Sequence, residues 1–324
     1  MSKPTVMMTA GLMPMIQEQL EQHFDVYRLD QTADKNALMD RIAADTIGIA
    51  HGGHSAHVDA GMLDRLPNVK LVSNFGVGYD GVDTDAARQR GIVVTNTPDV
   101  LTEEVADTAL GLLIMTAREL PQARDYLMAD RWAKEGDYRL TPHSLRDRSV
   151  GIVGLGRIGK SIATRCEAFG LPVSYFGRSK QAGVDYTYYD SATALAEAVD
   201  TLICVTPGTA ETHNMINAEV LAALGSRGIV INISRGSVID EAALKQALRD
   251  GTIAAAGLDV MVDEPNFDPE LMTFENIVLL PHVGSASQHT RNKMGQLTVD
   301  NLLRLKAGDA PISPVPETPF SSWK

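Results

Sequence analysis

Short apolar runs alternate with longer amphipathic stretches along the chain, a pattern that predicts parallel strands joined by helices. Before position 100, five runs predict strands at residues 5–8, 26–29, 47–50, 69–73 and 92–95. Helical spacing at residues 12–23 and 35–44 predicts helices between them. After position 150, a second series predicts strands at residues 150–153, 173–176, 201–205, 228–233, 253–257 and 277–280. The expected fold class is therefore α/β, with two Rossmann or flavodoxin-like domains that each contain a doubly wound parallel sheet.

Two further helical stretches indicate how the domains are connected. Residues 102–118 have apolar positions at helical spacing and begin with Glu103 and Glu104, which suit the positive helix end. Residues 287–306 predict a last helix that stops at Gly308. We expect this helix to return to the first domain, giving a substrate domain of residues 1–99 and 286–324 and an inserted dinucleotide-binding domain of residues 100–285. The cleft between them is the expected active site, and residues 310–324, rich in Pro and Ser, are expected to form a loosely ordered arm.

Composition narrows the class of protein. The 324 residues are 44% hydrophobic and 22% charged, which is typical of a soluble protein with two cores. A net charge of −12 argues against nucleic acid or an anionic membrane as partner, and no apolar run approaches a membrane span. The two cysteines, Cys166 and Cys204, fall in a predicted helix and strand and suit buried thiols. We therefore expect a cytoplasmic protein without a secretory signal.

The sequence GLGRIG at positions 154–159 is the most informative motif. It follows the apolar run at 150–153 and opens the helical stretch 160–169. In such a turn Gly154 permits the tight bend, Gly156 lets the backbone approach a pyrophosphate, and Gly159 lets helix pack on strand. A glycine-rich turn without a ligand is the alternative, but the flanking strand and helix favour a dinucleotide site.

The turn after the next predicted strand indicates which dinucleotide is bound. An acidic residue is usual there, since it binds the adenosine ribose 2′-hydroxyl. This chain has Arg178, Ser179 and Lys180 instead, which can bind a 2′-phosphate through charge-assisted hydrogen bonds. We predict NADPH as cofactor, with NADH used more weakly; the alternative is that these are ordinary solvated turn residues.

Three polar residues follow predicted strands of the second sheet. Arg235, Glu264 and His282 each come soon after an apolar run, where ligands of open α/β sheets bind. Arginine offers a fork for a carboxylate, histidine can protonate a developing alkoxide, and a carboxylate can orient the imidazole. Singly, Arg235 could be a surface ion-pair member and His282 a buried structural histidine; together they suit hydride transfer to a 2-oxo acid.

The stretches NISRGSVIDEAAL, AGLDVMVDEP and LLPHVGSAS, together with VGIVGLGRIGKSIATRCEAFG, resemble the D-isomer-specific 2-hydroxyacid dehydrogenase family. The resemblance covers almost the whole chain, including FGVGYDGVD and GIVVTNTPDVLTEEVADTALGLL. The YTYY stretch and the arginine-serine-lysine turn are similar to the NADPH-preferring glyoxylate/hydroxypyruvate reductases and the plant-type hydroxyphenylpyruvate reductases.

The resemblance implies roles for individual residues. Arg235 would bind the substrate carboxylate and carbonyl, His282 would be the acid/base, and Glu264 would keep the imidazole oriented and readily protonated. Backbone amides of Val77 and Gly78 would bind the carboxylate as well. Implied cofactor contacts are Thr108, Gly154, Gly156, Arg157, Ile158, Gly159, Arg178, Ser179, Lys180, Pro207, Thr212, Ile233, Ser234, Arg235, Asp259 (to the nicotinamide carboxamide), His282 and Gly284. The chain departs from its relatives at Pro207-Gly208-Thr209, in the loop expected to contact the adenine side of the cofactor, where relatives often have Pro-Leu-Thr.

Other polar residues are weaker candidates. His51, His54 and His57 lack helical spacing and a completing ligand, so no metal site is predicted, although one of them could line the substrate cleft. Trp132 suits packing, but in relatives a tryptophan near this position reaches toward the other subunit's active site.

The sequence thus predicts an NADPH-preferring reductase of small 2-oxo acids, with glyoxylate and hydroxypyruvate first, acting as a homodimer. Alternatives are a hydroxyphenylpyruvate or phosphoglycerate-type dehydrogenase, a formate dehydrogenase, or a nucleotide-sensing corepressor. Formate dehydrogenases usually have glutamine where Glu264 stands, and a corepressor would show no turnover.

Overall fold

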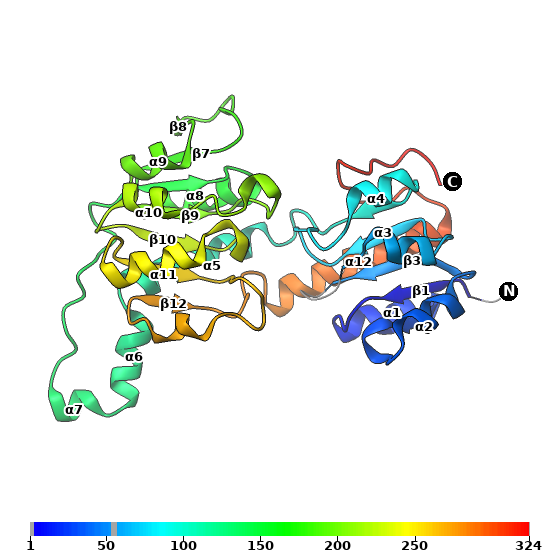
Figure 1. Cartoon of the computed structure of the whole chain (residues 1–324), viewed down its shortest axis with the longest axis horizontal. Helices are drawn as coiled ribbons and strands as arrows, with labels where there is room; N and C mark the ends of the chain where they lie inside the picture. Colours follow the sequence, from blue (N-terminus) through cyan, green and yellow to red (C-terminus); the bar gives the residue numbers. More distant parts are fainter. Residues whose placement is uncertain (1–2, 53–56, 324) are drawn as a thin grey trace. The chain divides into compact units, whose positions relative to one another are not determined.

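The computed structural model describes residues 3–52 and 57–323. The chain divides into two compact units, a terminal unit of Met1–Leu101 and Ser287–Lys324 and a central unit of Thr102–Ala286. Each unit contains a sheet whose paired strands are all parallel (Figure 1). The predicted α/β fold class is confirmed.

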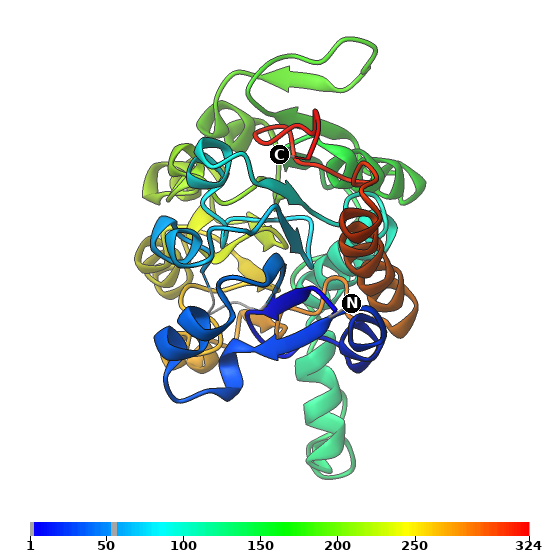
Figure 2. The ribbon, with the colours of Figure 1, turned by 90° about the vertical axis from the view of Figure 1, so that its right-hand side faces the viewer.

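The sheet of the terminal unit has the strand order β2-β1-β3-β4-β5. Its strands are β1 (Thr5–Met8), β2 (Asp25–Arg28), β3 (Thr46–His51), β4 (Leu71–Asn74) and β5 (Val93–Thr95). Its helices are α1 (Pro14–His23), α2 (Lys35–Ile42), α3 (Ala60–Arg65), α4 (Thr84–Gln89) and α12 (Gln288–Ala307), with a 3₁₀ turn η1 at Leu29–Gln31. Figure 2 shows α1 and α12 on one face of this sheet and α2, α3 and α4 on the other.

Successive strand residues of the terminal unit point to opposite faces, and each face has its own core. In β1, Val6 and Met8 pack with Ile16 of α1 and Leu302 of α12, whereas Met7 packs with the residues of α2 and α3. The Ser73 hydroxyl also donates to the Thr298 carbonyl at 2.9 Å. The last helix therefore completes a core that the first hundred residues leave open.

The segment after α12 is not the loosely ordered arm that its composition suggested. Val315 N donates to Val94 O at 2.9 Å, and Val94 N donates to Thr318 Oγ1 at 2.8 Å. The Asn301 side chain donates to Ser313 Oγ at 3.0 Å. The prediction was wrong because these groups provide the edge of β5 with partners that a neighbouring strand would otherwise supply.

The sheet of the central unit has the strand order β12-β11-β10-β9-β6-β7-β8. Its strands are β6 (Val150–Val153), β7 (Val173–Phe176), β8 (Thr187–Tyr189), β9 (Thr201–Cys204), β10 (Ile229–Asn232), β11 (Ala255–Leu258) and β12 (Ile277–Leu279). The chain enters at β6, runs outward to β8, and then crosses to β9 on the other side of β6. This reversal creates a switch point beside β6, where open α/β sheets bind ligands.

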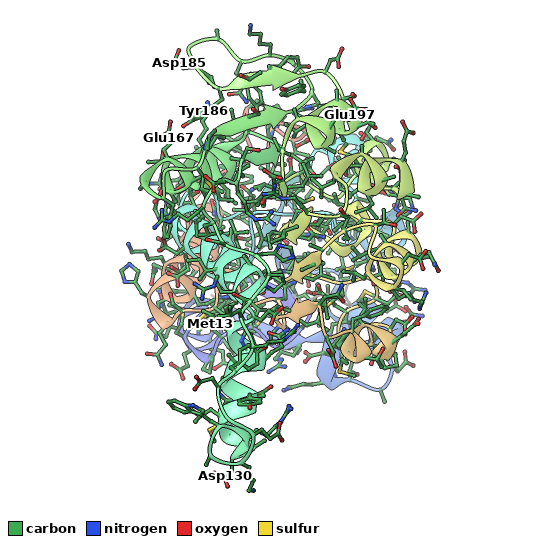
Figure 3. The ribbon with its side chains drawn as sticks, turned by 90° about the vertical axis from the view of Figure 1, so that its left-hand side faces the viewer. Met13, Asp130, Glu167, Asp185, Tyr186 and Glu197 are labelled. Carbon is green, nitrogen blue, oxygen red and sulfur yellow. The ribbon has the colours of Figure 1, made fainter. Side chains whose placement is uncertain are left out.

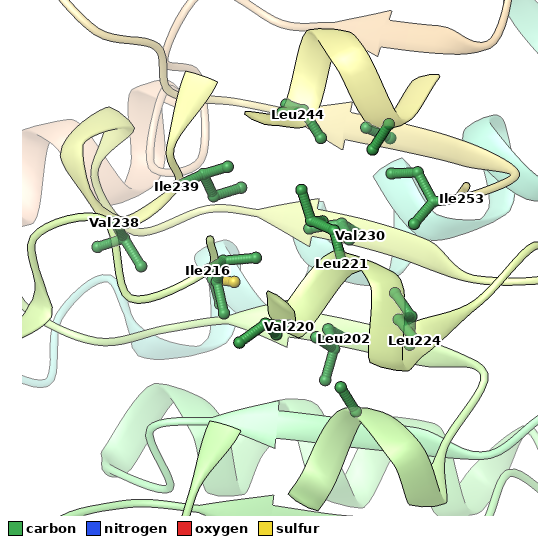
Figure 4. Packing of buried hydrophobic residues seen from close by; sticks show 14 of the residues in the cluster. Leu202, Ile216, Val220, Leu221, Leu224, Val230, Val238, Ile239, Leu244 and Ile253 are labelled. Atoms are coloured by element: carbon green, nitrogen blue, oxygen red, sulfur yellow. The ribbon is translucent and has the colours of Figure 1, made fainter. Parts of the chain in front are cut away.

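Helices of the central unit pack on both faces of its sheet, and two further helices project from it. They are α5 (Thr102–Ala117), α6 (Leu120–Met128), α7 (Arg131–Glu135), α8 (Arg157–Ala168), α9 (Ala192–Ala198), α10 (Ala218–Leu224) and α11 (Glu241–Asp250), with 3₁₀ turns η2 (Ala210–Thr212), η3 (Gly236–Val238) and η4 (Pro269–Thr273). Residues of α10 and α11 pack on β9 and β10, as Leu221, Leu244, Leu202 and Val230 show in Figure 4. Packing of α5 against α8, β10 and β11 covers the opposite face.

The helices α6 and α7 form an arm that projects from the central unit (Figure 1). Neither helix has a buried residue. Internal contacts shape the arm: the Tyr126 hydroxyl donates to Gly136 O at 2.8 Å, and the Arg131 guanidinium lies over the Tyr126 ring. Among the described residues, no helix is both long and apolar enough to cross a membrane.

Candidate active site

The glycine turn lies between β6 and α8, at the switch point of the central sheet. Gly154 has φ 102°, and a Cβ there would lie 3.0 Å from Thr206 Cγ2. A Cβ on Gly159 would lie 2.3 Å from the Gly154 carbonyl oxygen, so this glycine permits the close packing of helix on strand. A Cβ on Gly156 would meet no atom within 4 Å. The first and third glycines are therefore required by the fold, whereas the second leaves open space at the helix start.

This open space suits the pyrophosphate of a dinucleotide. Gly156 is the N-cap of α8 and provides no side-chain acceptor for the first N–H groups of the helix, which begins with Arg157 and Ile158. Beside the turn, Thr206 Oγ1 is buried and has no partner within the described part of the chain. A helix start without a side-chain cap and a buried hydroxyl beside Gly154 that has no described partner are features that suit a bound phosphate group.

The loop from Pro207 to Thr212 brings two predicted cofactor residues together. Thr212 Oγ1 donates to the Pro207 carbonyl at 2.6 Å and accepts from Thr209 N at 2.8 Å. A Cβ on Gly208 would lie 2.9 Å from Arg235 Cγ, so the departure from Pro-Leu-Thr leaves room for the stem of that arginine.

The turn after β7 exposes Arg178, Ser179 and Lys180. Strand β7 is tied to the glycine turn, because Gly154 N donates to the Phe176 carbonyl at 2.9 Å. A hydrogen bond from Thr209 lowers the pKa of Glu211 in η2, and the positive charge of Arg178 acts in the same direction.

The predicted trio follows three adjacent strands at one edge of the sheet: Arg235 after β10, Glu264 after β11 and His282 after β12. His282 Nδ1 lies 2.7 Å from Glu264 Oε2, and the second oxygen of Glu264 accepts from Met261 N at 2.8 Å. Both carboxylate oxygens of Glu264 are therefore engaged, and its hydrogen bond to Nδ1 directs the other ring nitrogen, Nε2, away from the carboxylate.

The backbone at His282 is held from β11. His282 has φ 52°, and its N–H donates to the Asp259 carbonyl at 2.8 Å. The Asp259 carboxylate accepts from Val283 N at 2.7 Å and from Gly284 N at 2.8 Å. Burial raises the pKa of this carboxyl, and the two backbone amides act against it. The Thr108 hydroxyl donates to Gly284 O at 3.3 Å, which joins α5 to the same loop.

Arg235 is held by a residue that the sequence analysis did not single out. The side chain of Asn232, buried at the end of β10, donates to the Arg235 carbonyl at 2.9 Å and accepts from Ser234 N at 3.0 Å. Arg235 Nη1 donates to Ser234 O at 2.7 Å. The signal was a single asparagine in the otherwise apolar run that includes Ile231 and Ile233.

Val77 and Gly78 belong to the terminal unit, in the loop after β4. Asn74 Nδ2 donates to Gly78 O at 2.9 Å, and Asn96 Nδ2 donates to Val77 O at 2.9 Å. Among the described residues, neither the N–H of Val77 nor the N–H of Gly78 donates a hydrogen bond. The two asparagines thus fix the carbonyls of the loop and leave two amides for an anion.

The remaining candidates are placed as follows. His51 is buried and its Nδ1 lies 3.1 Å from Thr9 Oγ1, His57 is exposed, and His54 lies outside the described residues. No group of three or more His, Cys, Asp or Glu side chains in residues 3–52 and 57–323 could hold a metal ion. Trp132 is 58% exposed on the arm.

Comparison with known proteins bears on the class of protein. Residues 110–284 match the family model "D-isomer specific 2-hydroxyacid dehydrogenase, NAD binding domain". The chain is 40% identical over 310 residues to glyoxylate/hydroxypyruvate reductase A of Arabidopsis thaliana, covering 96% of this chain and 98% of that protein. It is 42% identical over 311 residues to hydroxyphenylpyruvate reductase of Plectranthus scutellarioides, with coverage of 96% and 98%.

A solved structure agrees with these relatives. The NADPH-dependent glyoxylate/hydroxypyruvate reductase of Sinorhizobium meliloti, in complex with NADP and malonate, matches with a TM-score of 0.93 and 51% identity over 98% of both chains. Fold, glycine turn and relatives together define an oxidoreductase that uses a nicotinamide dinucleotide. Within that class, the chain belongs to the D-isomer-specific 2-hydroxyacid dehydrogenase family. The resemblance inferred from the sequence is confirmed.

Proposed function

We propose that the protein reduces small 2-oxo acids, glyoxylate and hydroxypyruvate first, to the corresponding 2-hydroxy acids. The observation that carries this proposal is the 2.7 Å contact between His282 Nδ1 and Glu264 Oε2 at the sheet edge where Arg235 also lies. Two relatives with high coverage support the substrate class through their names, glyoxylate/hydroxypyruvate reductase and hydroxyphenylpyruvate reductase.

The chemistry divides among these residues. The Arg235 guanidinium binds the substrate carboxylate through two parallel hydrogen bonds. NADPH, held at the glycine turn before α8, would supply the hydride for C2 of the 2-oxo acid. His282 Nε2 donates its proton to the oxygen that becomes the hydroxyl, and Glu264 stabilises the protonated imidazole before this transfer. Asp259 holds the backbone at His282, and Asn232 holds the backbone at Arg235.

We further propose that NADPH is preferred and that NADH is used more weakly. Arg178, Ser179 and Lys180 offer two cations and a hydroxyl in an exposed turn where an acidic residue would repel a 2′-phosphate. The Sinorhizobium meliloti relative, which is named as NADPH-dependent and was solved with NADP, supports this preference.

The proposed assembly is a homodimer in the cytoplasm. Leu127, Met128 and Trp132 are exposed on the arm, and an apolar patch of this kind suits a second copy of the chain. Cys166 and Cys204 are buried free thiols whose pKa burial raises to about 12, which suits a reducing compartment.

Initial rates test the proposed activity. We expect turnover with NADPH and glyoxylate or hydroxypyruvate to exceed turnover with pyruvate, hydroxyphenylpyruvate and 2-oxoglutarate. The hydroxyphenylpyruvate relative makes that substrate the second candidate, and higher kcat/KM for it would replace the first. Arg235→Lys should lose the bidentate fork and lower kcat/KM for every 2-oxo acid while leaving NADPH binding intact. No turnover with any of these acids would refute the activity and favour a nucleotide-sensing protein.

A further inference from the structure

The exposed turn at Arg178–Lys180 is anchored at both ends by tyrosine hydroxyls. We infer that Tyr175 and Gln181 are positioning residues for cofactor selection, because they hold this turn in the shape that receives a 2′-phosphate. The inference rests on the proposed preference for NADPH and adds residues that do not touch the cofactor themselves.

The first anchor lies before the turn. The Tyr188 hydroxyl of β8 donates to the Gly177 carbonyl at 3.3 Å. Tyr188 pairs with Tyr175 across β7 and β8, and their ring centroids are 5.3 Å apart. The edge strand β8 therefore fixes the point at which the chain leaves β7.

The second anchor lies directly after the turn. Gln181 N donates to the Tyr175 hydroxyl at 2.8 Å, and Gln181 Nε2 donates to the Leu155 carbonyl at 2.6 Å. Leu155 stands between the first two glycines of the GLGRIG motif. Gln181 thus connects the basic turn with the turn that would hold the pyrophosphate.

The burial of Tyr175 indicates why its hydroxyl matters. This side chain is 1% exposed within the sheet, where phenylalanine would pack equally well. The hydroxyl instead receives the N–H of Gln181, at the end of an exposed polar turn. Without this hydrogen bond, the turn would lose conformational freedom when a phosphate binds, and that loss would weaken binding. Because the hydrogen bond already holds the turn in place, it strengthens binding of the phosphate in particular.

The test compares two ligands that differ only by the 2′-phosphate. Titration calorimetry on the full-length protein measures the Kd of 2′,5′-ADP and of 5′-AMP for the wild type, Tyr175→Phe and Gln181→Met. Each variant loses a hydrogen bond, so its Kd for 2′,5′-ADP should rise roughly three- to tenfold. The Kd for 5′-AMP should change less than about twofold, because 5′-AMP lacks the group that the turn binds.

Tyr186→Phe is the matched control. The Tyr186 hydroxyl donates to Glu167 at 3.0 Å (Figure 3) and stands directly before β8, whereas the basic turn follows β7, so its removal should leave both Kd values unchanged. If Tyr175→Phe does not fold, as judged by circular dichroism, Gln181→Met decides the question, since that side chain is only half-buried.

The possible outcomes separate this inference from the proposed cofactor preference. Equal weakening of both ligands would show a purely structural role, and unchanged Kd values for 2′,5′-ADP would also overturn the inference. In either case the preference itself stands if the wild type binds 2′,5′-ADP more tightly than 5′-AMP and Arg178→Ala removes the difference. A wild type that binds both ligands equally would refute the preference and the inference together.

Discussion

His282 and Glu264 form a pair in which the glutamate has no oxygen left unengaged, since Met261 N occupies one and His282 Nδ1 the other. General acid catalysis typically contributes ~10²–10⁴-fold to a rate, and His282→Ala should lower kcat by about that factor. Steady-state kinetics at saturating NADPH measure this, and dinucleotide binding, followed by fluorescence, should persist. A decrease below about tenfold would assign proton transfer to another group.

Glu264→Gln tests whether the carboxylate positions the proton donor. The glutamine loses the negative charge that engages His282 Nδ1 at 2.7 Å, so kcat should fall while dinucleotide binding persists. The measurements are kcat at saturating 2-oxo acid and the Kd of NADPH for wild type and variant. An unchanged kcat would show that the contact with Glu264 does not position His282 for proton transfer.

His51 predicts a pH effect on the stability of the protein. Burial of the His51 side chain lowers its pKa from an ordinary value of 6.5 to about 4, and the nearby charge of His57 acts in the same direction. Between these values the unfolded chain binds a proton that the folded chain does not, so stability is complete above pH 6.5 and declines as pH falls toward 4. The loss reaches about 3 kcal/mol when complete.

Urea unfolding of His51→Gln between pH 7 and 4.5 measures this contribution. The variant should lose less stability over the interval than the wild type does. His289→Gln, an exposed histidine on α12, is the control and should follow the wild type. Identical pH dependence in His51→Gln and wild type would exclude His51 as the source.

Among single residues, sequence reasoning predicted those whose chemistry is visible in a motif. Arg235, Glu264 and His282 follow apolar runs, and the parallel sheet brings their strands together. Asn232, Asn74 and Thr206 were missed because their contribution depends on where their side chains point after folding. An asparagine that holds a neighbouring carbonyl has the same one-letter signature as one that faces solvent.

At the scale of elements, the glycine turn between β6 and α8 predicts that alanine at Gly159 lowers stability, whereas alanine at Gly156 weakens dinucleotide binding. A Cβ at Gly159 would overlap the Gly154 carbonyl, so Gly159→Ala should destabilise the protein by about 1–3 kcal/mol, the usual range for overpacking. A Cβ at Gly156 would enter open space, and φ −79° suits alanine. Gly156→Ala should therefore keep its unfolding midpoint and bind dinucleotide more weakly, because the methyl group occupies the expected pyrophosphate position.

Thermal unfolding and NADPH titration of both variants distinguish these effects. Loss of stability in Gly156→Ala, or tight binding by it, would contradict the assignment of the open space. The wild type and Gly111→Ala, a position on α5 where a Cβ meets no atom within 4 Å, serve as references.

Most elements could be predicted because buried parallel strands appear as apolar runs. Strand β8 was missed, since Thr187–Tyr189 is three residues long, polar in part and at an exposed edge. The segment after α12 was wrongly predicted as loose, because its order depends on hydrogen bonds to β5, more than 200 positions earlier in the chain. Contacts of that kind leave no periodic signal in the sequence.

At the scale of the whole molecule, the exposed apolar side chains on the arm of α6 and α7 lead us to expect a homodimer. Leu127, Met128 and Trp132 are 53%, 69% and 58% exposed, which is unusual for large apolar side chains on neighbouring turns. Leu127→Asp combined with Trp132→Ala should convert the expected dimer to a monomer, measured by light scattering after size-exclusion chromatography. Met272→Ala, a 64% exposed position on η4, should leave the mass unchanged. A wild type that is monomeric at micromolar concentration would refute the proposed homodimer.

The return of α12 to the terminal unit has a consequence for synthesis on the ribosome. The sheet of β1 to β5 emerges first, yet the helix that covers one of its faces follows the whole of residues 102–286. At ~5–20 residues per second, that interval lasts roughly 10–40 s. Throughout it Val6, Met8 and Leu71 lack their contacts with Val299 and Leu302, so the nascent chain presents an apolar surface to chaperones until α12 has been synthesised.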